Sequence, residues 1–83
     1  MTDQHIQSLQ ALSQDLYRVA IGRHRGQTEM SIRFANEAKA RLAELSSFNL
    51  ADKIMYSLNS KAERSAEDLL MYSTLVRNIT LRR

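Results

Sequence analysis

The chain lacks proline, and its only glycines are Gly22 and Gly26. Proline and glycine are the residues that most often interrupt regular secondary structure. The long stretch after Gly26 contains neither of them. Because its apolar residues recur three and four positions apart, this absence of breakers predicts an all-α protein.

Cysteine is absent as well, which excludes disulfide bonds, thiolate metal ligands and thiol catalysis. The sequence holds no apolar run of about 18 residues, so we expect no membrane-spanning helix and no membrane partner. Its start, Met-Thr-Asp-Gln-His, is mostly polar and lacks the basic and apolar regions of a secretion signal. These features fit a reducing compartment, and we expect a cytoplasmic location.

The length of 83 residues is enough for one domain, and no linker, repeat or low-complexity segment divides the chain. Tryptophan is absent and aromatic residues are few, so the core must come mainly from Leu, Ile, Ala and Met. A core of this size gives little surplus stability. We therefore expect residues 1–83 to form a single helical domain, a small bundle of three to four helices that oligomerisation could complete.

A first helix is predicted from about residue 3 to residue 21. Its apolar residues fall at the steps of one helical face, at Ile6, Leu9, Leu12, Leu16 and Val19. Polar residues that include Asp15 and Arg18 occupy the other side. Residues 22–26 then interrupt the pattern. Because glycine tolerates the positive φ that often closes a helix, these residues predict a tight connection.

A second helix is predicted to begin with Thr28 as its N-cap. Its apolar stripe consists of Met30, Phe34, Ala38, Leu42 and Leu45. Ser46 and Ser47 weaken the pattern, and Asn49 followed by Asp52 resembles a new helix start. A short third helix would then carry Leu50, Ile54 and Leu58 on one face. The alternative is one continuous helix that passes through both serines.

The start of the last helix is marked by the capping-box sequence Ser60-Lys61-Ala62-Glu63. In this motif the serine side chain accepts from the N–H of the third helical residue, and the glutamate accepts from the serine N–H. We expect this helix to run to about Leu81. Its repeating apolar positions are Ala62, Ala66, Leu69, Tyr72, Val76 and Ile79, with Leu70 and Leu75 beside them.

No pattern in the sequence supports catalysis. The two histidines, His5 and His24, have no carboxylate three or four positions away that could orient the ring. Histidine pairs at metal-binding spacing, nucleophile motifs and glycine-rich phosphate loops are also absent. We therefore expect a protein that is not an enzyme, with no catalytic residue, cofactor, metal or small-molecule substrate.

Arginine is the one chemically distinctive residue type that clusters, with nine arginines against three lysines and a net charge of +3. One group, Arg18, Arg23 and Arg25, surrounds the glycine turn, and another, Arg77, Arg82 and Arg83, lies at the carboxyl end. Arginine binds phosphate bidentately, which suits nucleic acid. Cations also stabilise the carboxyl ends of helices, no aromatic residue interleaves these arginines, and +3 is low for a dedicated nucleic-acid binder. A nucleic-acid-associated regulator with contacts at Arg18, Arg23, Arg25, Arg82 and Arg83 is the alternative hypothesis.

Apolar residues off the main helical faces favour a different function. They are Tyr17, Ile21, Ile32, Phe48, Met55, Tyr56, Met71 and Leu81. Short helices cannot turn all of them inward, and exposed apolar patches commonly mark interfaces. We predict a noncatalytic protein-interaction module, a regulator, an adaptor or a small subunit of an assembly, that binds a protein partner or itself. The residues predicted to contact the partner are Phe48, Tyr56, Met71 and Tyr72.

Overall fold

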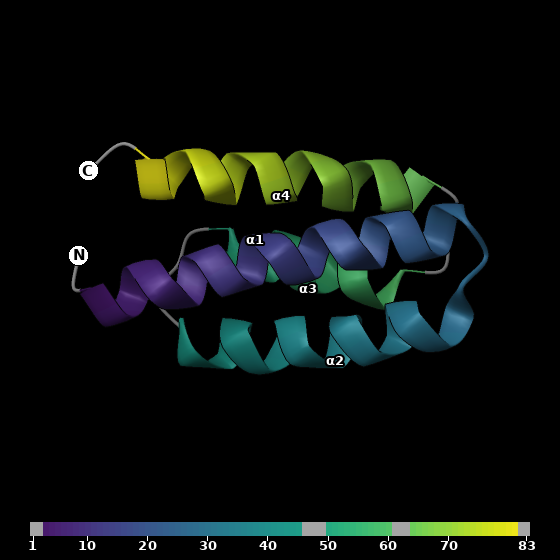
Figure 1. The fold of residues 1–83 in the computed structure, drawn as a ribbon, viewed down its shortest axis with the longest axis horizontal. Helices are drawn as coiled ribbons and strands as arrows, with labels where there is room; N and C mark the ends of the chain where they lie inside the picture. The colour runs from purple at the N-terminus through teal and green to yellow at the C-terminus, as the bar shows by residue number, and fades with distance from the viewer. Residues whose placement is uncertain (1–2, 46–49, 61–63, 82–83) are drawn as a thin grey trace.

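In the computed structural model the chain forms four α-helices packed together (Figure 1). The structure describes residues 3–45, 50–60 and 64–81. The helices are α1 (Asp3–His24), α2 (Thr28–Glu44), α3 (Ala51–Asn59) and α4 (Arg64–Leu81). Helices that follow each other along the chain run in opposite directions (Figure 1), as in an up-and-down bundle. The predicted all-α bundle is confirmed, and the described residues contain no strand.

The first helix is the centre of the bundle. It packs against both α2 and α4, while the short α3 packs against the same two helices from the opposite side. The apolar stripe predicted on α1 is buried along its whole length. The buried residues that face it are Ala35, Ala38 and Leu42 on α2, Ile54 and Leu58 on α3, and Leu69 and Val76 on α4. Each large apolar side chain buried in this way contributes roughly 1.5–3 kcal/mol.

The end of α1 differs from the prediction. The helix continues to His24, and the residue that closes it is Gly26, with a φ of +73°. The N–H of Gln27 donates to the carbonyl of Gly22 at 2.8 Å, and the N–H of Gly26 donates to that of Arg23 at 3.3 Å. These two bonds form a Schellman motif, which satisfies the last carbonyls of the helix.

Gly22 lies inside α1, so the prediction that the connection begins at this residue is wrong. A Cβ at Gly22 would lie 3.0 Å from the Cβ of Ser31 and 3.2 Å from Cε of Met30, both on α2. Glycine at this position therefore allows α1 and α2 to approach closely. Close helix packing and helix termination both favour glycine because it has no side chain, so the sequence alone does not show which of the two requires Gly22.

The predicted N-cap of α2 is also wrong. Thr28 is the first helical residue, and the N-cap position belongs to Gln27, which makes no side-chain capping hydrogen bond. The helix ends at Glu44, and α3 begins at Ala51, so the predicted break between the second and third helices is confirmed. Residues 46–49, which include the two serines and Asn49, lie outside the described residues.

The last helix ends at Leu81, as predicted. Ser60 has φ −75° and ψ 140°, an extended conformation that ends α3 and is also typical of N-cap residues. Residues 61–63 lie outside the described residues, so the capping box remains a prediction. None of the described helices combines the length and the apolar character that crossing a bilayer requires.

Candidate functional site

The outward surface of α4 carries large apolar side chains with few charges between them. These side chains, between 41% and 70% exposed, are Leu70, Met71, Leu75 and Leu81. Their spacing places them on one side of the helix, with the uncharged residues Thr74 and Asn78 between them. Arg77 is the only charged residue between Leu69 and Leu81. We call Leu70, Met71, Leu75 and Leu81 the α4 apolar surface.

The exposed side of α2 is different in kind. Its exposed residues are Thr28, Glu29, Ile32, Arg33, Asn36, Glu37, Ala40, Arg41, Ala43 and Glu44. Five of these are charged, and Arg41 approaches Glu44 at 4.0 Å. Both helices lie at the outside of the bundle and have similar lengths. The fold itself therefore does not require an outer helix to expose large apolar residues.

The predicted partner-binding residues lie on this surface or beside it. Met71 belongs to the α4 apolar surface, and the neighbouring Tyr72 is half-buried and lines a groove with residues of α3. Tyr56, on α3, is 77% exposed. Tyr56 and Tyr72 line one shallow groove of about 390 Å³ between α3 and α4, together with Asp52, Lys53, Ser57 and Asp68. Phe48 lies outside the described residues.

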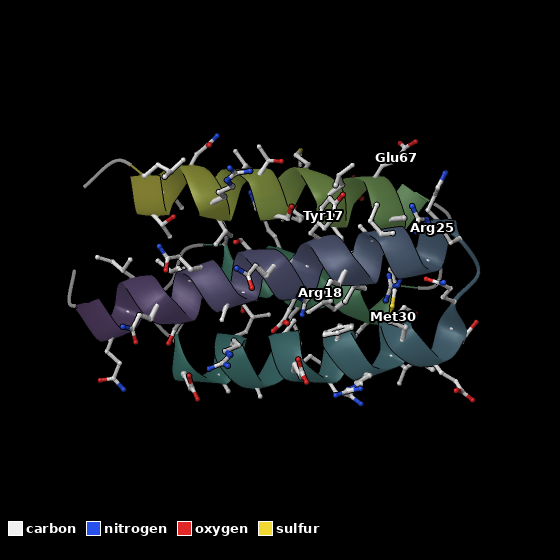
Figure 2. All side chains as sticks on the ribbon, viewed as in Figure 1. Tyr17, Arg18, Arg25, Met30 and Glu67 are labelled. Carbon is white, nitrogen blue, oxygen red and sulfur yellow. The ribbon has the colours of Figure 1, made fainter. Side chains whose placement is uncertain are left out.

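The sequence analysis missed Leu70 and Leu75 as candidate contacts, since both stand next to the core-facing positions of α4. The signal that identifies them is the near absence of charge from Leu69 to Leu81. A helix that faces water on one side normally carries charged residues there. Tyr17 is a further exposed aromatic residue, on the α4 side of α1 (Figure 2).

The arginines predicted to bind anions do not form one basic surface. Arg18 lies on the α2 side of α1 (Figure 2), and its guanidinium carbon is 4.9 Å from the ring centre of Phe34. Arg33 approaches the same ring at 5.8 Å. Both are cation–π distances. Phe34 therefore reaches Arg18 from a different helix, a contact that the order of residues in the sequence did not predict.

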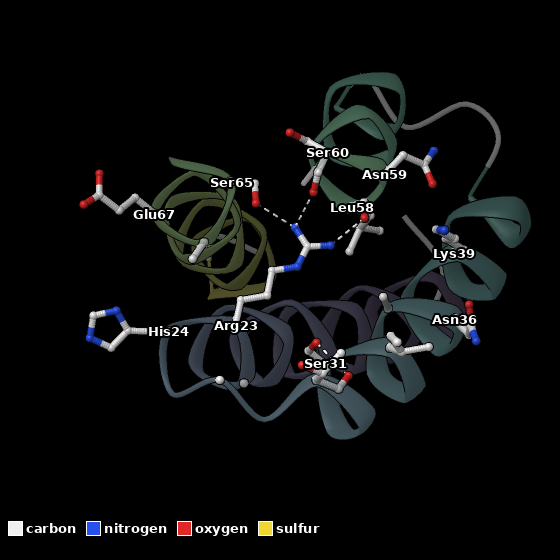
Figure 3. Close-up of a pocket in the computed structure, with 16 residues that line it drawn as sticks. Arg23, His24, Ser31, Asn36, Lys39, Leu58, Asn59, Ser60, Ser65 and Glu67 are labelled. Carbon is white, nitrogen blue, oxygen red and sulfur yellow. Dashed lines mark hydrogen bonds between the residues drawn. The ribbon is translucent and has the colours of Figure 1, made fainter. Parts of the chain in front are cut away.

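Arg25 and Arg23 occupy two other environments. Arg25 is exposed, and its N–H donates to the carbonyl of Ile21 at 3.0 Å in the closing turn of α1. Arg23 is half-buried and extends into a cleft (Figure 3). Arg82 and Arg83 lie outside the described residues. Since Arg18 and Arg23 are five positions apart on a helix, their side chains point about 140° apart.

Arg23 binds the carboxyl end of α3. Its Nη1 donates to the carbonyls of Ser57 at 3.0 Å and Ser60 at 3.1 Å, and its Nη2 donates to that of Leu58 at 2.6 Å. Nη1 also donates to Oγ of Ser65 on α4 at 2.8 Å (Figure 3). The last carbonyls of a helix lack backbone partners and carry partial negative charge, so a cation stabilises them. Burial lowers the pKa of Arg23 from its ordinary value.

The cleft around Arg23 has a volume of about 810 Å³. It opens where α1 and α3 end and where α2 and α4 begin (Figure 3). Beside Arg23, it is lined by Gly22, His24, Gly26, Thr28, Ser31, Ile32, Ala35, Asn36, Lys39, Leu58, Asn59, Ser60, Ser65, Ala66 and Glu67. Glu67 is the only carboxylate among these residues, and it is exposed. The cations among these lining residues include Arg23 and Lys39.

Asp15 is a buried carboxyl group on α1, only 6% exposed. Its predicted place on the solvent side is wrong, because α2 packs against that side of the helix. Burial raises the pKa of Asp15, the charge of Glu37 and a hydrogen bond with it raise this pKa further, and Arg41 and Arg18 partly oppose the shift. Neither carboxyl group lines the cleft or the α3–α4 groove. The pair belongs to the packing of α1 on α2.

No group of three metal-ligating side chains gathers within the described parts of the chain. Comparison with known proteins finds no family model, no curated protein and no solved structure that matches this chain. Its function must therefore be inferred from the chemistry of its own surface.

Proposed function

We propose that this protein is a noncatalytic protein-interaction module, a regulator, adaptor or small assembly subunit, that binds a protein partner or a second copy through α4. The observation that supports this proposal is the contrast between the two outer helices. The exposed side of α2 is rich in charge, whereas α4 exposes Leu70, Met71, Leu75 and Leu81. Removing apolar surface from water gains roughly 25 cal/mol per Å², so the α4 apolar surface favours association.

The groove between α3 and α4 extends this contact surface. Tyr56 and Tyr72 line it, and tyrosine is enriched in protein interfaces because its ring is apolar and its hydroxyl can form hydrogen bonds. Asp52, Lys53 and Asp68 give the groove charged edges. An apolar centre with a polar edge is the usual composition of a specific interface.

The alternative function, nucleic-acid binding, has weaker support. Arg18 packs on the ring of Phe34, and Arg23 donates four hydrogen bonds to residues of α3, α4 and the segment after α3. Arginines in such different environments do not give the continuous basic surface that nucleic-acid binders present. Retention on a heparin or DNA column, and its dependence on salt, tests this alternative.

The proposed function is tested by placing charge on the α4 apolar surface. We expect the double variant Leu70→Glu/Leu75→Glu to keep its helical circular dichroism, because both side chains are more than 40% exposed. It should lose self-association in sedimentation velocity, or lose the partner that the unmodified chain captures from the source organism. The controls are Ile32→Glu and the single variant Leu75→Glu, which each add one negative charge at an exposed apolar position, the first on α2 and the second on the α4 apolar surface.

If the double variant and Ile32→Glu associate as strongly as the unmodified chain, the α4 apolar surface is not the interface. Thermal unfolding gives an independent measurement. Because ligands that bind only the folded state stabilise it, the thermal midpoint should rise with protein concentration or with added partner. A very stable monomer with no such dependence, but with salt-sensitive DNA or RNA affinity, would favour the alternative.

A further inference from the structure

Arg23 carries a positive charge that no carboxylate balances within the described residues. Its four hydrogen bonds go to three backbone carbonyls, which carry only partial negative charge, and to one serine hydroxyl. Burial lowers its pKa, and no acidic group within the described residues opposes this shift. These hydrogen bonds leave the full charge of Arg23 without an ionic partner among the described residues, which favours an anionic ligand in the cleft.

The guanidinium also keeps a free hydrogen-bond donor. Arginine has five N–H groups, and all the bonds of Arg23 come from Nη1 and Nη2. Its Nε–H therefore has no partner in the described parts of the chain. Figure 3 shows the guanidinium in the middle of the cleft, with Lys39 and Asn36 on the α2 side of the same space.

The size and the walls of the cleft suit a small molecule. Its volume of about 810 Å³ lies within the range of roughly 300–1,000 Å³ that is common for small-molecule sites. The amides of Asn36 and Asn59 line it together with apolar atoms of Ile32 and Leu58. The exposed Glu67 is the one acidic side chain in this lining.

We propose that this cleft binds a small phosphate-bearing molecule, with the phosphate between Arg23 and Lys39. A phosphate oxygen accepts a hydrogen bond from Nε–H of Arg23, and the ammonium group of Lys39 supplies the second positive charge. The two asparagine amides are donors and acceptors for the rest of the molecule. This site goes beyond the proposed interaction function, since no residue of the α4 apolar surface lines it.

The probe for this site is inorganic phosphate, added to the full chain at an ionic strength held constant with chloride. Backbone amide shifts in NMR spectra should change in a saturable way near Arg23, Ser31, Asn36 and Lys39. Lys39→Gln should weaken phosphate binding about fivefold, the effect of one half-exposed ion pair. Lys39 forms no hydrogen bond or ion pair with the described residues, so this variant removes the charge without removing a hydrogen bond or ion pair of the fold.

The matched control is Lys53→Gln, which removes the same charge from α3 at a position that does not line the cleft. This variant should bind phosphate within about twofold of the unmodified chain, because separated surface charges are screened by salt. Shifts that do not saturate, shifts centred on Arg18 and Phe34, or equal losses in the two lysine variants would each overturn the site.

Discussion

The guanidinium of Arg23 on α1 donates to the hydroxyl of Ser65 on α4 at 2.8 Å, although 42 positions separate these residues. The same side chain binds the carbonyls of Ser57, Leu58 and Ser60 at the end of α3. One residue therefore joins three helices. At nine residues, α3 is too short to be stable alone, so it depends on such contacts.

Arg23→Ala should lower the free energy of unfolding by about 2 kcal/mol, because hydrogen bonds from a charged donor are lost and the carbonyls of α3 keep no replacement. Urea denaturation measures this change. The control is Arg25→Ala, an exposed arginine two positions away, which should change the stability by less than about 0.5 kcal/mol. Equal effects of the two would mean that the contacts of Arg23 contribute little.

Gly26→Ala should destabilise the protein by about 1 kcal/mol, because a φ of +73° is unfavourable for a residue with a Cβ. Apart from its chain neighbours, no atom of the described residues lies within 4 Å of the added Cβ, so crowding makes no contribution. Gly26→Asn should cost less than Gly26→Ala, since asparagine tolerates this conformation better. Thermal or urea unfolding of the pair checks the order, and a reversed order would contradict the assignment of the Schellman motif.

Gly22→Leu should lower the stability by roughly 1–3 kcal/mol, because the new side chain would enter the contact between α1 and α2. Gly22→Ala should fail to give the gain of about 0.5–1 kcal/mol that alanine normally brings to a helix interior. The reason is the 3.0 Å distance from its Cβ to that of Ser31. Both variants are compared by urea denaturation. A clear gain in Gly22→Ala would show that α2 moves away at little cost.

Asp15→Asn should raise the thermal midpoint at neutral pH. The pKa of Asp15 is raised in the folded protein, so the folded state holds the proton more tightly than the unfolded chain. The stability from this proton is present below the ordinary pKa of 3.8 and is lost as pH rises through the raised value. The advantage of the uncharged amide should therefore shrink as the pH falls toward 3.8.

The control for this pH profile is Asp52→Asn, because Asp52 is exposed at the start of α3. It should give no gain at neutral pH. A midpoint of Asp15→Asn that stays below that of the unmodified chain at every pH would show that the carboxyl group is needed for more than its charge.

Helical periodicity predicted most of the fold, since the buried positions of α3 and α4 and the stripe of α1 repeat at three- and four-residue steps. It failed for Asp15 because α1 is central and contacts neighbours on more than one side. A helix with two neighbours buries more than its apolar stripe. A polar residue outside that stripe can therefore face a neighbouring helix or water, and the spacing of residues in the sequence is the same in both cases. The environment of Arg23 could not be predicted either, since its acceptors lie 34 to 42 positions further along the chain.

The candidate contact surface was only partly predictable for a related reason. Tyr56, Met71 and Tyr72 stood out because they fall off the main apolar stripes or are aromatic. Leu70 and Leu75 did not, because a sequence does not say how far around a helix its neighbours extend. The arginines were grouped too readily, because residues close in sequence can point in different directions on a helix. Their closeness in sequence suggested one cluster, but the turn of the helix separates Arg18 from Arg23.

The packing of α1 against α4 has a consequence for biosynthesis. Helix α1 leaves the ribosome before α4 does, so its contact surface for α4 stays uncovered until α4 has emerged. At a synthesis rate of about 5–20 residues per second, this delay lasts several seconds. Throughout that interval the nascent chain exposes an apolar side of α1. On a crowded polysome, α1 of one chain can meet α4 of a neighbouring chain. Exchange of α4 between the two chains then competes with the packing of α4 on α1 within one chain.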